Sequence, residues 1–81
     1  MKYRLIKSWR KNKKLAVLYN GKYIHFGDKR YSDYLEHKDK KRRERYLKRA
    51  SQIRDKNGNL TINNPNSPNY WATRILWKYK G

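Results

Sequence analysis

Lysine and arginine crowd the middle of the chain at a spacing that could bind phosphate. The basic side chains of this run are Lys38, Lys40, Lys41, Arg42, Arg43, Arg45, Lys48 and Arg49. On a helix, a loose group would share one side: Lys38, Lys41, Arg42, Arg45 and Arg49. Such cations can contact nucleic-acid phosphates and release counterions. The alternative is a solvated helix face with ion pairs such as Glu36–Lys40 and Glu44–Lys48. We expect phosphate binding, because these pairs leave most of the positive charge unmatched.

A second basic group lies near the N-terminus, among aromatic rings. Its cations are predicted to face solvent: Arg4, Arg10, Lys11, Lys13 and Lys14. Trp9, Tyr19 and Tyr23 are interleaved with them, a pattern that could form a stacking platform for single-stranded bases. The alternative puts the rings in the core beneath the helices. We expect the core, because a small domain must fill its interior with large side chains.

Acidic residues raise the weaker hypothesis of a metal-dependent nuclease. Glu36-His37-Lys38 matches E-x-K, the end of a nuclease carboxylate–lysine pattern, and Asp28 or Asp33 lies upstream. So short a match has little specificity, and the same residues would suit the first turn of a helix. His25 has no His, Ser or Cys partner at a useful spacing, so we expect it to be packed or hydrogen-bonded rather than catalytic.

The composition excludes several classes of protein. The 81 residues carry 23 Lys and Arg against 6 Asp and Glu, a formal net charge of +17, and 36% of them are hydrophobic. No stretch approaches the ~20 apolar residues of a membrane span, and the N-terminus lacks the apolar region of a signal peptide. Without cysteine there is no disulfide, and a zinc site is not expected. A surplus charge of this size favours a polyanionic partner such as DNA or RNA.

Residues 1–27 are predicted to form a three-stranded antiparallel meander. Residues 2–9 largely alternate between apolar and polar side chains, and two short β-rich runs follow at residues 15–19 and 23–26. Asn20-Gly21 stands between these runs. This pair favours a type I′ hairpin turn, in which both central residues need a positive φ.

Residues 32–56 are predicted to form a long basic helix. Ser32 suits its N-cap, and Asp33 and Glu36 would complement the helix dipole in the first turn. The centre, residues 37–45, is polar throughout. It is therefore either the solvent-facing part of one helix or a break between two.

A loop over residues 57–67 is predicted to lead to a short aromatic C-terminal helix over residues 68–79. Ser67-Pro68 is a specific start signal, a capping serine followed by proline in the first turn. The whole chain, residues 1–81, is thus expected to be one small α+β domain. Its order would be a three-stranded antiparallel meander, the long basic helix and the aromatic helix.

Particular residues of the central and C-terminal parts follow a recognisable order. They are His25-Phe26-Gly27, Tyr31-Ser32-Asp33-Tyr34, His37-Lys38-Asp39, Arg42, Arg43, Tyr46 and Arg49, then Tyr70-Trp71, Arg74, Leu76 and Trp77. This order resembles that of small basic proteins of unknown function in large DNA viruses, which include giant viruses of algae and amoebae and some tailed phages. The resemblance covers residues 22–77 and implies a viral setting without implying an activity. The chain departs from the pattern at Leu35-Glu36 and Ala50-Ser51, where a Thr-x pair and a His are expected.

Charge and resemblance together predict non-enzymatic, largely sequence-independent nucleic-acid binding, with DNA favoured over RNA. The expected role is viral genome compaction or packaging, in the virion or the interior of the infected cell, neither secreted nor at a membrane. Phosphates are expected at Arg4, Arg10, Lys11, Lys13, Lys14, Lys38, Lys41, Arg42, Arg43, Arg45, Lys48 and Arg49. No catalytic residue, metal or cofactor is expected.

The alternative function is that of a minor capsid or capsid-cementing structural protein, with capsid proteins as partners. Trp71 and Trp77 would then anchor the partner, since tryptophan often dominates interface energetics. The nuclease hypothesis is the least favoured of the three.

Overall fold

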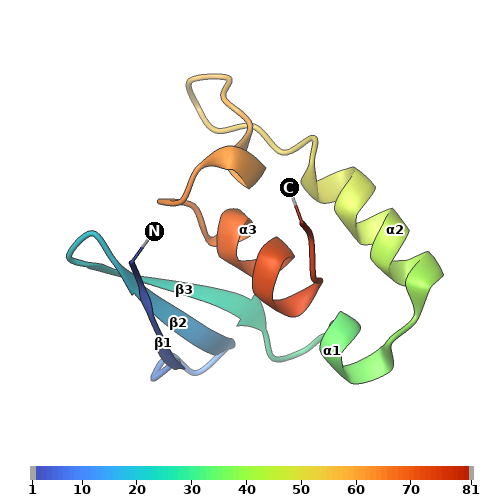
Figure 1. Cartoon of the computed structure of the whole chain (residues 1–81), viewed down its shortest axis with the longest axis horizontal. Helices are drawn as coiled ribbons and strands as arrows, with labels where there is room; N and C mark the ends of the chain where they lie inside the picture. The colour runs from blue at the N-terminus through green and yellow to red at the C-terminus, as the bar shows by residue number, and fades with distance from the viewer. Residues whose placement is uncertain (1, 81) are drawn as a thin grey trace.

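The computed structural model describes residues 2–80 and has the predicted α+β arrangement, an antiparallel sheet followed by helices (Figure 1). The strands are β1 (Arg4–Lys7), β2 (Lys13–Tyr19) and β3 (Lys22–Asp28). The helices are α1 (Tyr34–His37), α2 (Lys40–Ala50) and α3 (Pro68–Trp71). A 3₁₀ turn, η1 (Thr61–Asn63), precedes α3, and a π-helical segment, η2 (Ala72–Leu76), follows it. Residues 1 and 81, the ends of the predicted domain, lie outside the described residues.

The sheet has the order β1-β2-β3 with antiparallel neighbours, which confirms the predicted meander. Asn20 and Gly21 join β2 to β3 with φ values of 53° and 78°, as the predicted hairpin turn requires. Val17 lies opposite Ile24 in the register, and directly opposite residues project to the same face of a sheet. This pairing gives the sheet one strongly apolar face.

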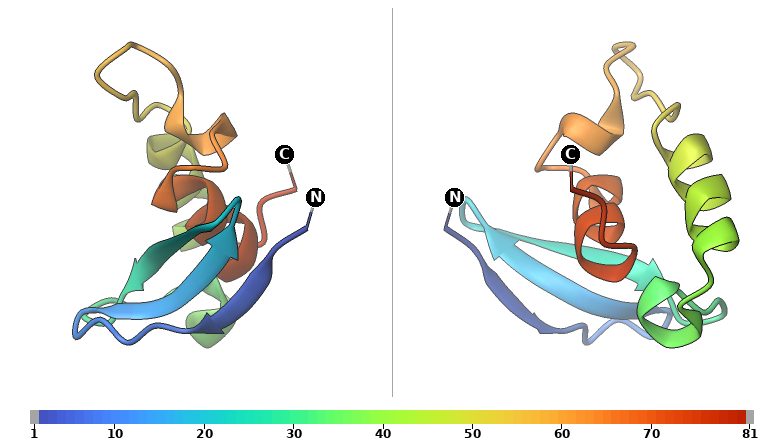
Figure 2. Two further views of the ribbon diagram at one scale, coloured as in Figure 1. Left: turned by 90° about the vertical axis from the view of Figure 1, so that its left-hand side faces the viewer. Right: turned by 45° about the vertical axis from the view of Figure 1, so that its right-hand side comes forward.

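The hydrophobic core lies between that face of the sheet and the C-terminal helical segment (Figure 2). Its buried members are Val17, Ile24, Phe26, Trp71, Ala72, Leu76 and Trp77. The first three come from the sheet and the other four from α3, η2 and the residue that follows them. α2 attaches from the side, because the Tyr46 ring stacks on Trp77 with centroids 4.0 Å apart and planes 7° apart.

The predicted helix over residues 32–56 is two helices in the structure, so the alternative of a break in its polar centre is the right one. Lys38 ends α1 in the left-handed conformation, with a φ of 55°. Asp39 then begins α2, and its carboxylate accepts hydrogen bonds from the N–H groups of Lys41 and Arg42. A side chain that caps a new helix favours a break, because it satisfies donors that a continuous helix would bond internally.

Both ends of the predicted helix also differ from the structure. The N-cap of α1 is Asp33 rather than Ser32, and its carboxylate accepts a hydrogen bond from the Leu35 N–H at 3.0 Å. α2 ends at Ala50 instead of continuing to residue 56. Beyond it, the Asp55 carboxylate accepts hydrogen bonds from two backbone N–H groups, at residues 57 and 59, and so stabilises a turn. No helix within residues 2–80 is both long and apolar enough to cross a membrane.

The C-terminal helix is shorter than the predicted 68–79. Ser67 caps it as expected, accepting a hydrogen bond from the Asn69 N–H at 3.3 Å. After Trp71 the helix widens into η2 and ends at Leu76. Thr73 lies in this wider turn, fully buried, and its hydroxyl donates to the Asn69 carbonyl at 2.8 Å.

The predicted loop over residues 57–67 is pinned to the C-terminal helix. Ile62 is buried within η1. The Trp71 indole N–H donates to the carbonyl of Pro65 at 2.7 Å, and the Arg74 guanidinium donates to the carbonyl of Ile62 at 2.7 Å. These bonds hold the loop against α3 and η2.

Candidate nucleic-acid interface

A cleft of about 870 Å³ lies between α2, the end of β3 and the C-terminal helical segment. Its basic lining residues are Lys13, Lys14, Arg42, Arg45 and Arg49, and its acidic ones are Asp28 and Asp33. Phe26, Leu76 and Trp77 supply much of the apolar wall. We call this hollow the basic cleft, and its defining cations are Lys13, Arg42, Arg45 and Arg49.

Helical spacing brings the three arginines of the basic cleft together. Arg42, Arg45 and Arg49 stand at positions i, i+3 and i+7 of α2, so they fall on one side of the helix. The stacking of Tyr46 on Trp77 fixes the rotation of α2 about its axis. Burial of this phenol also raises the pKa of Tyr46. The arginines therefore point toward the cleft as a set.

The charge of the three arginines is not matched by protein acceptors. Among residues 2–80, none of these guanidinium groups makes a hydrogen bond or ion pair with a protein oxygen. The nearby carboxylate of Asp28 is bound by Arg30 at 2.8 Å. Hydrogen bonds from the Arg30 side chain and N–H lower the pKa of Asp28 to about 2. The cleft thus offers forked donors to an external anion.

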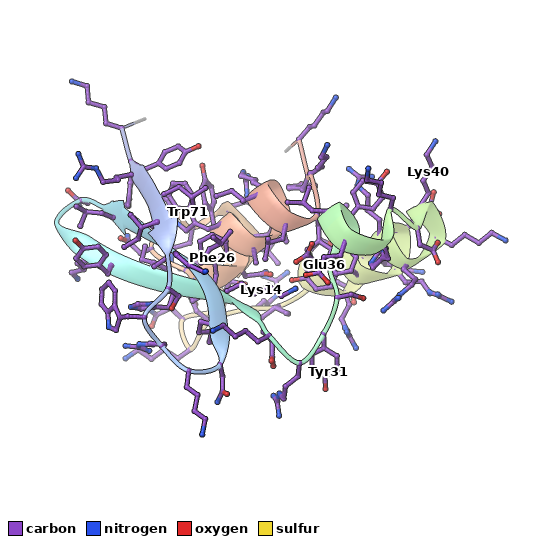
Figure 3. The ribbon with its side chains drawn as sticks, turned by 90° about the horizontal axis from the view of Figure 1, so that it is seen from below. Lys14, Phe26, Tyr31, Glu36, Lys40 and Trp71 are labelled. Carbon is purple, nitrogen blue, oxygen red and sulfur yellow. The ribbon has the colours of Figure 1, made fainter. Side chains whose placement is uncertain are left out.

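Lys14 was predicted to contact phosphate, but in the structure it forms internal ion pairs. Its Nζ donates to Asp33 Oδ2 at 2.7 Å, to Glu36 Oε1 at 2.8 Å and to the Tyr31 carbonyl at 2.8 Å. In Figure 3 its side chain extends from the sheet toward Glu36. Burial disfavours the charge of Lys14, but the hydrogen bonds to the two carboxylates outweigh burial and raise its pKa. Lys14 therefore ties β2 to α1.

Arg43 is also committed to the fold rather than free for phosphate. Its Nε donates to the Trp77 carbonyl and its Nη2 to the Lys78 carbonyl, each at 2.8 Å. Its guanidinium also lies over the Tyr34 ring, 5.5 Å from the centroid. This arginine holds the end of the chain against α2 and does not line the basic cleft, so its role in phosphate contact stays a prediction.

The remaining predicted cations are exposed but do not line the basic cleft. Lys38, Lys41 and Lys48 lie on the α1–α2 break and on other sides of α2. Arg4, Arg10 and Lys11 belong to β1 and the turn that follows it. The structure brings together four of the twelve predicted phosphate contacts, Lys13 and three arginines, with a fifth, Lys14, beside them in an ion pair.

The two predicted partner anchors are buried. Trp71 is 3% exposed and Trp77 is 8% exposed, because both pack in the hydrophobic core. Neither ring is available to a partner in this fold, so this part of the capsid hypothesis is wrong. The sequence shows that both tryptophans belong to a short C-terminal helix. It does not show whether they face the core or an outside partner.

Of three aromatic rings near the sheet that are expected in the core, two are exposed. Trp9 is 64% exposed and Tyr23 is 49% exposed, although both were expected in the core. Tyr19 alone of the three meets the core, with its ring centroid 5.6 Å from that of Trp71. The strand register explains the difference between the two tyrosines, because Tyr23 pairs with Leu18, the neighbour of Tyr19 on β2, and neighbours on a strand project to opposite faces.

His25 has a partner that the sequence analysis missed. Ser8 Oγ lies 2.8 Å from His25 Nδ1. Ser8 follows β1, and the register places the small residue Ala16 of β2 between Ile6 of β1 and His25 of β3. Burial, together with the charges of Arg10 and Lys13, lowers the pKa of His25. The edge of the Trp9 ring covers the imidazole at 4.5 Å. To predict this contact, one must know both how β1 pairs with β2 and how β2 pairs with β3. The spacing of Ser8 and His25 along the chain does not reveal it.

The carboxylates of the nuclease hypothesis are engaged elsewhere. Asp33 and Glu36 both bind the ammonium of Lys14, and Asp28 binds Arg30. Within residues 2–80, no group of three His, Cys, Asp or Glu side chains is placed to hold a metal ion.

The first part of the chain matches a protein family. The model of a family described as a family of unknown function (DUF5754) matches residues 3–50, from β1 to the end of α2. No curated protein and no solved structure matches the chain. The matched segment includes all four defining cations of the basic cleft.

Proposed function

This chain belongs to the DUF5754 family, and we propose that it binds nucleic acid by holding backbone phosphates in the basic cleft. The observation that carries the proposal is the set of three guanidinium groups on one side of α2 without protein acceptors. Arginine presents paired N–H donors that match the oxygens of a phosphate. Lys13 adds a fourth cation from the sheet.

The expected binding is largely independent of sequence and non-enzymatic. Contacts to phosphate fix the position of a protein on nucleic acid but do not read bases. The surplus charge of +17 adds a long-range attraction to any polyanion. DNA is the proposed target, and compaction or packaging of a viral genome is the proposed role. The viral setting rests on the resemblance described above.

The proposal is tested by the salt dependence of binding. We would titrate a labelled duplex of about 20 base pairs with the protein between about 50 and 200 mM NaCl, and follow fluorescence anisotropy. The test variant is Arg42→Gln/Arg45→Gln/Arg49→Gln. If each arginine contacts one phosphate, its loss lowers the slope of log K against log salt by about 0.9, or by about 2.7 for the three. Affinity near 100 mM salt should fall roughly 500-fold, because a slope change of about 2.7 acts over one decade of salt below 1 M.

A matched control removes the same charge from the same helix. Lys40→Gln/Lys41→Gln/Lys48→Gln leaves the basic cleft intact and should change the slope by less than about 1. Equal losses for the two triple variants would show that binding is spread over α2 and would contradict a cleft site. If wild type fails to bind at low salt, nucleic acid is the wrong partner, and the acidic surface of another protein becomes the leading alternative.

A further inference from the structure

The sheet face that points away from the core is open. Val17 and Ile24 point toward the helices, so their neighbours on the strands, including Leu18, Tyr23 and His25, project to the other face. Figure 2 shows the C-terminal helical segment and α2 on the core side of the sheet and α1 near its end. This open face is the one that carries the unexpectedly exposed rings.

Three of its rings form one contiguous group. Trp9 meets Tyr23 with centroids 4.9 Å apart and planes at 76°, and meets His25 at 4.5 Å and 86°. Trp9 and Tyr23 remain 64% and 49% exposed, although each packs on another ring. We call Trp9, Tyr23 and His25 the ring platform.

The ring platform is held in place by its surroundings. Ser8 Oγ bonds to His25 Nδ1 at 2.8 Å and accepts the Arg10 N–H at 3.0 Å. The Ser8 N–H donates to the Lys14 carbonyl at 3.2 Å. These bonds fix the backbone on both sides of Trp9, so a ligand that stacks there need not immobilise a loose chain.

The positive charge around the ring platform favours the binding of an anionic ligand. Residues 2–27 include no Asp or Glu, and the first acidic residue of the chain is Asp28. Arg4 projects from β1 opposite Leu18, and Arg10 lies close enough to His25 to lower its pKa. A second copy of this chain would bring like charge to the same face and be repelled.

We propose that the ring platform stacks the bases of a single nucleic-acid strand whose phosphates enter the basic cleft. The inference rests on the proposed function and narrows its target. Only unpaired bases offer their faces to a protein ring, because a duplex keeps its bases stacked on one another. The ring platform and the basic cleft lie on opposite faces of the sheet, so the strand must pass around its end. The turn after β1 lies there, closed by a hydrogen bond from the Lys13 N–H to the Arg10 carbonyl at 3.3 Å, and it joins Trp9 to Lys13 of the basic cleft. A strand that follows this turn passes the basic residues Arg10, Lys11 and Lys13.

The test compares an oligo-dT of about 20 nucleotides with a duplex of the same length, by anisotropy at about 100 mM NaCl. Wild type should bind the single strand more tightly. Trp9→Leu should weaken single-strand binding by roughly 5- to 150-fold, the range found for the loss of one base–ring stack. Duplex affinity should change by less than about 2-fold. Trp9→Phe keeps a ring and should retain most of the affinity.

Tyr3→Leu is the matched control, because Tyr3 is 50% exposed but packs on Trp71 and belongs neither to the ring platform nor to the lining of the basic cleft. It should leave single-strand affinity within about 2-fold of wild type. Thermal melting of each variant confirms that it is folded.

Tryptophan fluorescence gives an independent readout. Trp71 and Trp77 are buried, so quenching by oligo-dT should come from Trp9 and disappear in Trp9→Phe while binding persists. Equal quenching by polyglutamate would show that the face accepts any acidic chain and would overturn the stacking proposal.

The two proposals fail in different ways. If Trp9→Leu weakens neither ligand while the triple arginine variant weakens both, the ring platform is wrong and the basic cleft stands. If wild type prefers the duplex, the single-strand proposal is overturned. If wild type binds neither ligand at low salt, the proposed function itself is wrong.

Discussion

Two adjacent lysines on β2 show why position matters more than the number of charges. Lys14 is bound by two carboxylates and a carbonyl, whereas Lys13 makes no side-chain hydrogen bond or ion pair among residues 2–80. Asp33 is 4% exposed, so its carboxylate would be a buried charge without an ion-pair partner if Lys14 were replaced. The same residue type thus has a structural role at one position and is free to bind an anion at the next.

His25 should make the fold sensitive to mild acid. Its pKa lies below the usual 6.5 because of burial and the charges of Arg10 and Lys13, so the unfolded chain takes up a proton at higher pH than the folded one. The stability contributed by neutral His25 is present above pH 6.5 and is lost as the pH falls toward the folded pKa. Each pKa unit of difference corresponds to about 1.4 kcal/mol, or a Tm shift of about 6–11 °C in a domain of this size.

Thermal melts between about pH 7.5 and about pH 5, without nucleic acid, measure this effect. His25→Asn removes the titrating ring and keeps an amide near the Nδ1 position, so its Tm should depend less on pH. An equally steep dependence in His25→Asn would assign the acid sensitivity to other groups.

At the scale of elements, Gly27 fixes how β3 meets the C-terminal helical segment. Its φ is +81°, and an added Cβ would lie 2.7 Å from Leu76 Cδ1. Leu76 is 5% exposed and packed in the core, so its side chain has little room to move away. Gly27→Ala should therefore lower the free energy of unfolding by about 2–4 kcal/mol, from backbone strain and overpacking together.

Urea unfolding checks this value, and Gly21→Ala is the control. Gly21 has a similar φ of +78° but open space around it, so only the backbone strain of about 1–2 kcal/mol should appear. If the clash with Leu76 matters, the double variant Gly27→Ala/Leu76→Ala should lose less stability than the sum of the two single variants. Equal losses for Gly27→Ala and Gly21→Ala would remove the packing argument.

The sequence predicts the sheet better than the helices. Asn20-Gly21 specifies a turn through local backbone chemistry, so the hairpin could be predicted. The break at Lys38 depends on Asp39 capping a new helix, whereas helix propensity alone favours continuation. Capping residues that lie within a polar run leave the hydrophobic pattern unchanged, so the pattern could not reveal this break.

The candidate site is only half predictable from the sequence. Helical spacing grouped five cations, of which Arg42, Arg45 and Arg49 line the basic cleft, whereas Lys38 precedes α2 and Lys41 does not line the cleft. The same spacing does not show that Arg43 binds carbonyls at the end of the chain or that Lys14 binds Asp33. Those partners lie 34, 35 and 19 residues away, and only the tertiary fold brings them into contact.

At the scale of the whole molecule, the surplus of 17 positive charges should oppose folding when salt is low. The molecule measures 35 × 29 × 23 Å. The screening length is about 30 Å at 10 mM salt, so nearly all the charges repel one another, but it is about 8 Å at 150 mM. Raising NaCl between these concentrations should raise the Tm by several degrees.

Differential scanning fluorimetry measures this shift. The triple variant Arg42→Gln/Arg45→Gln/Arg49→Gln carries three charges fewer on one helix side, so its gain with salt should be smaller. A Tm that falls as salt increases would mean that attractive ion pairs such as Lys14–Asp33 outweigh the repulsion.

The last helical segment completes a core that the sheet begins, and this order matters while the protein is being made. A nascent chain that has grown only to the end of α2 has its three sheet core residues, Val17, Ile24 and Phe26, but still lacks Trp71, Leu76 and Trp77. Its apolar sheet face cannot be covered until translation has passed residue 77 and the segment has left the ribosome. Until then, mutual repulsion between the strongly basic growing chains on a polysome opposes their aggregation.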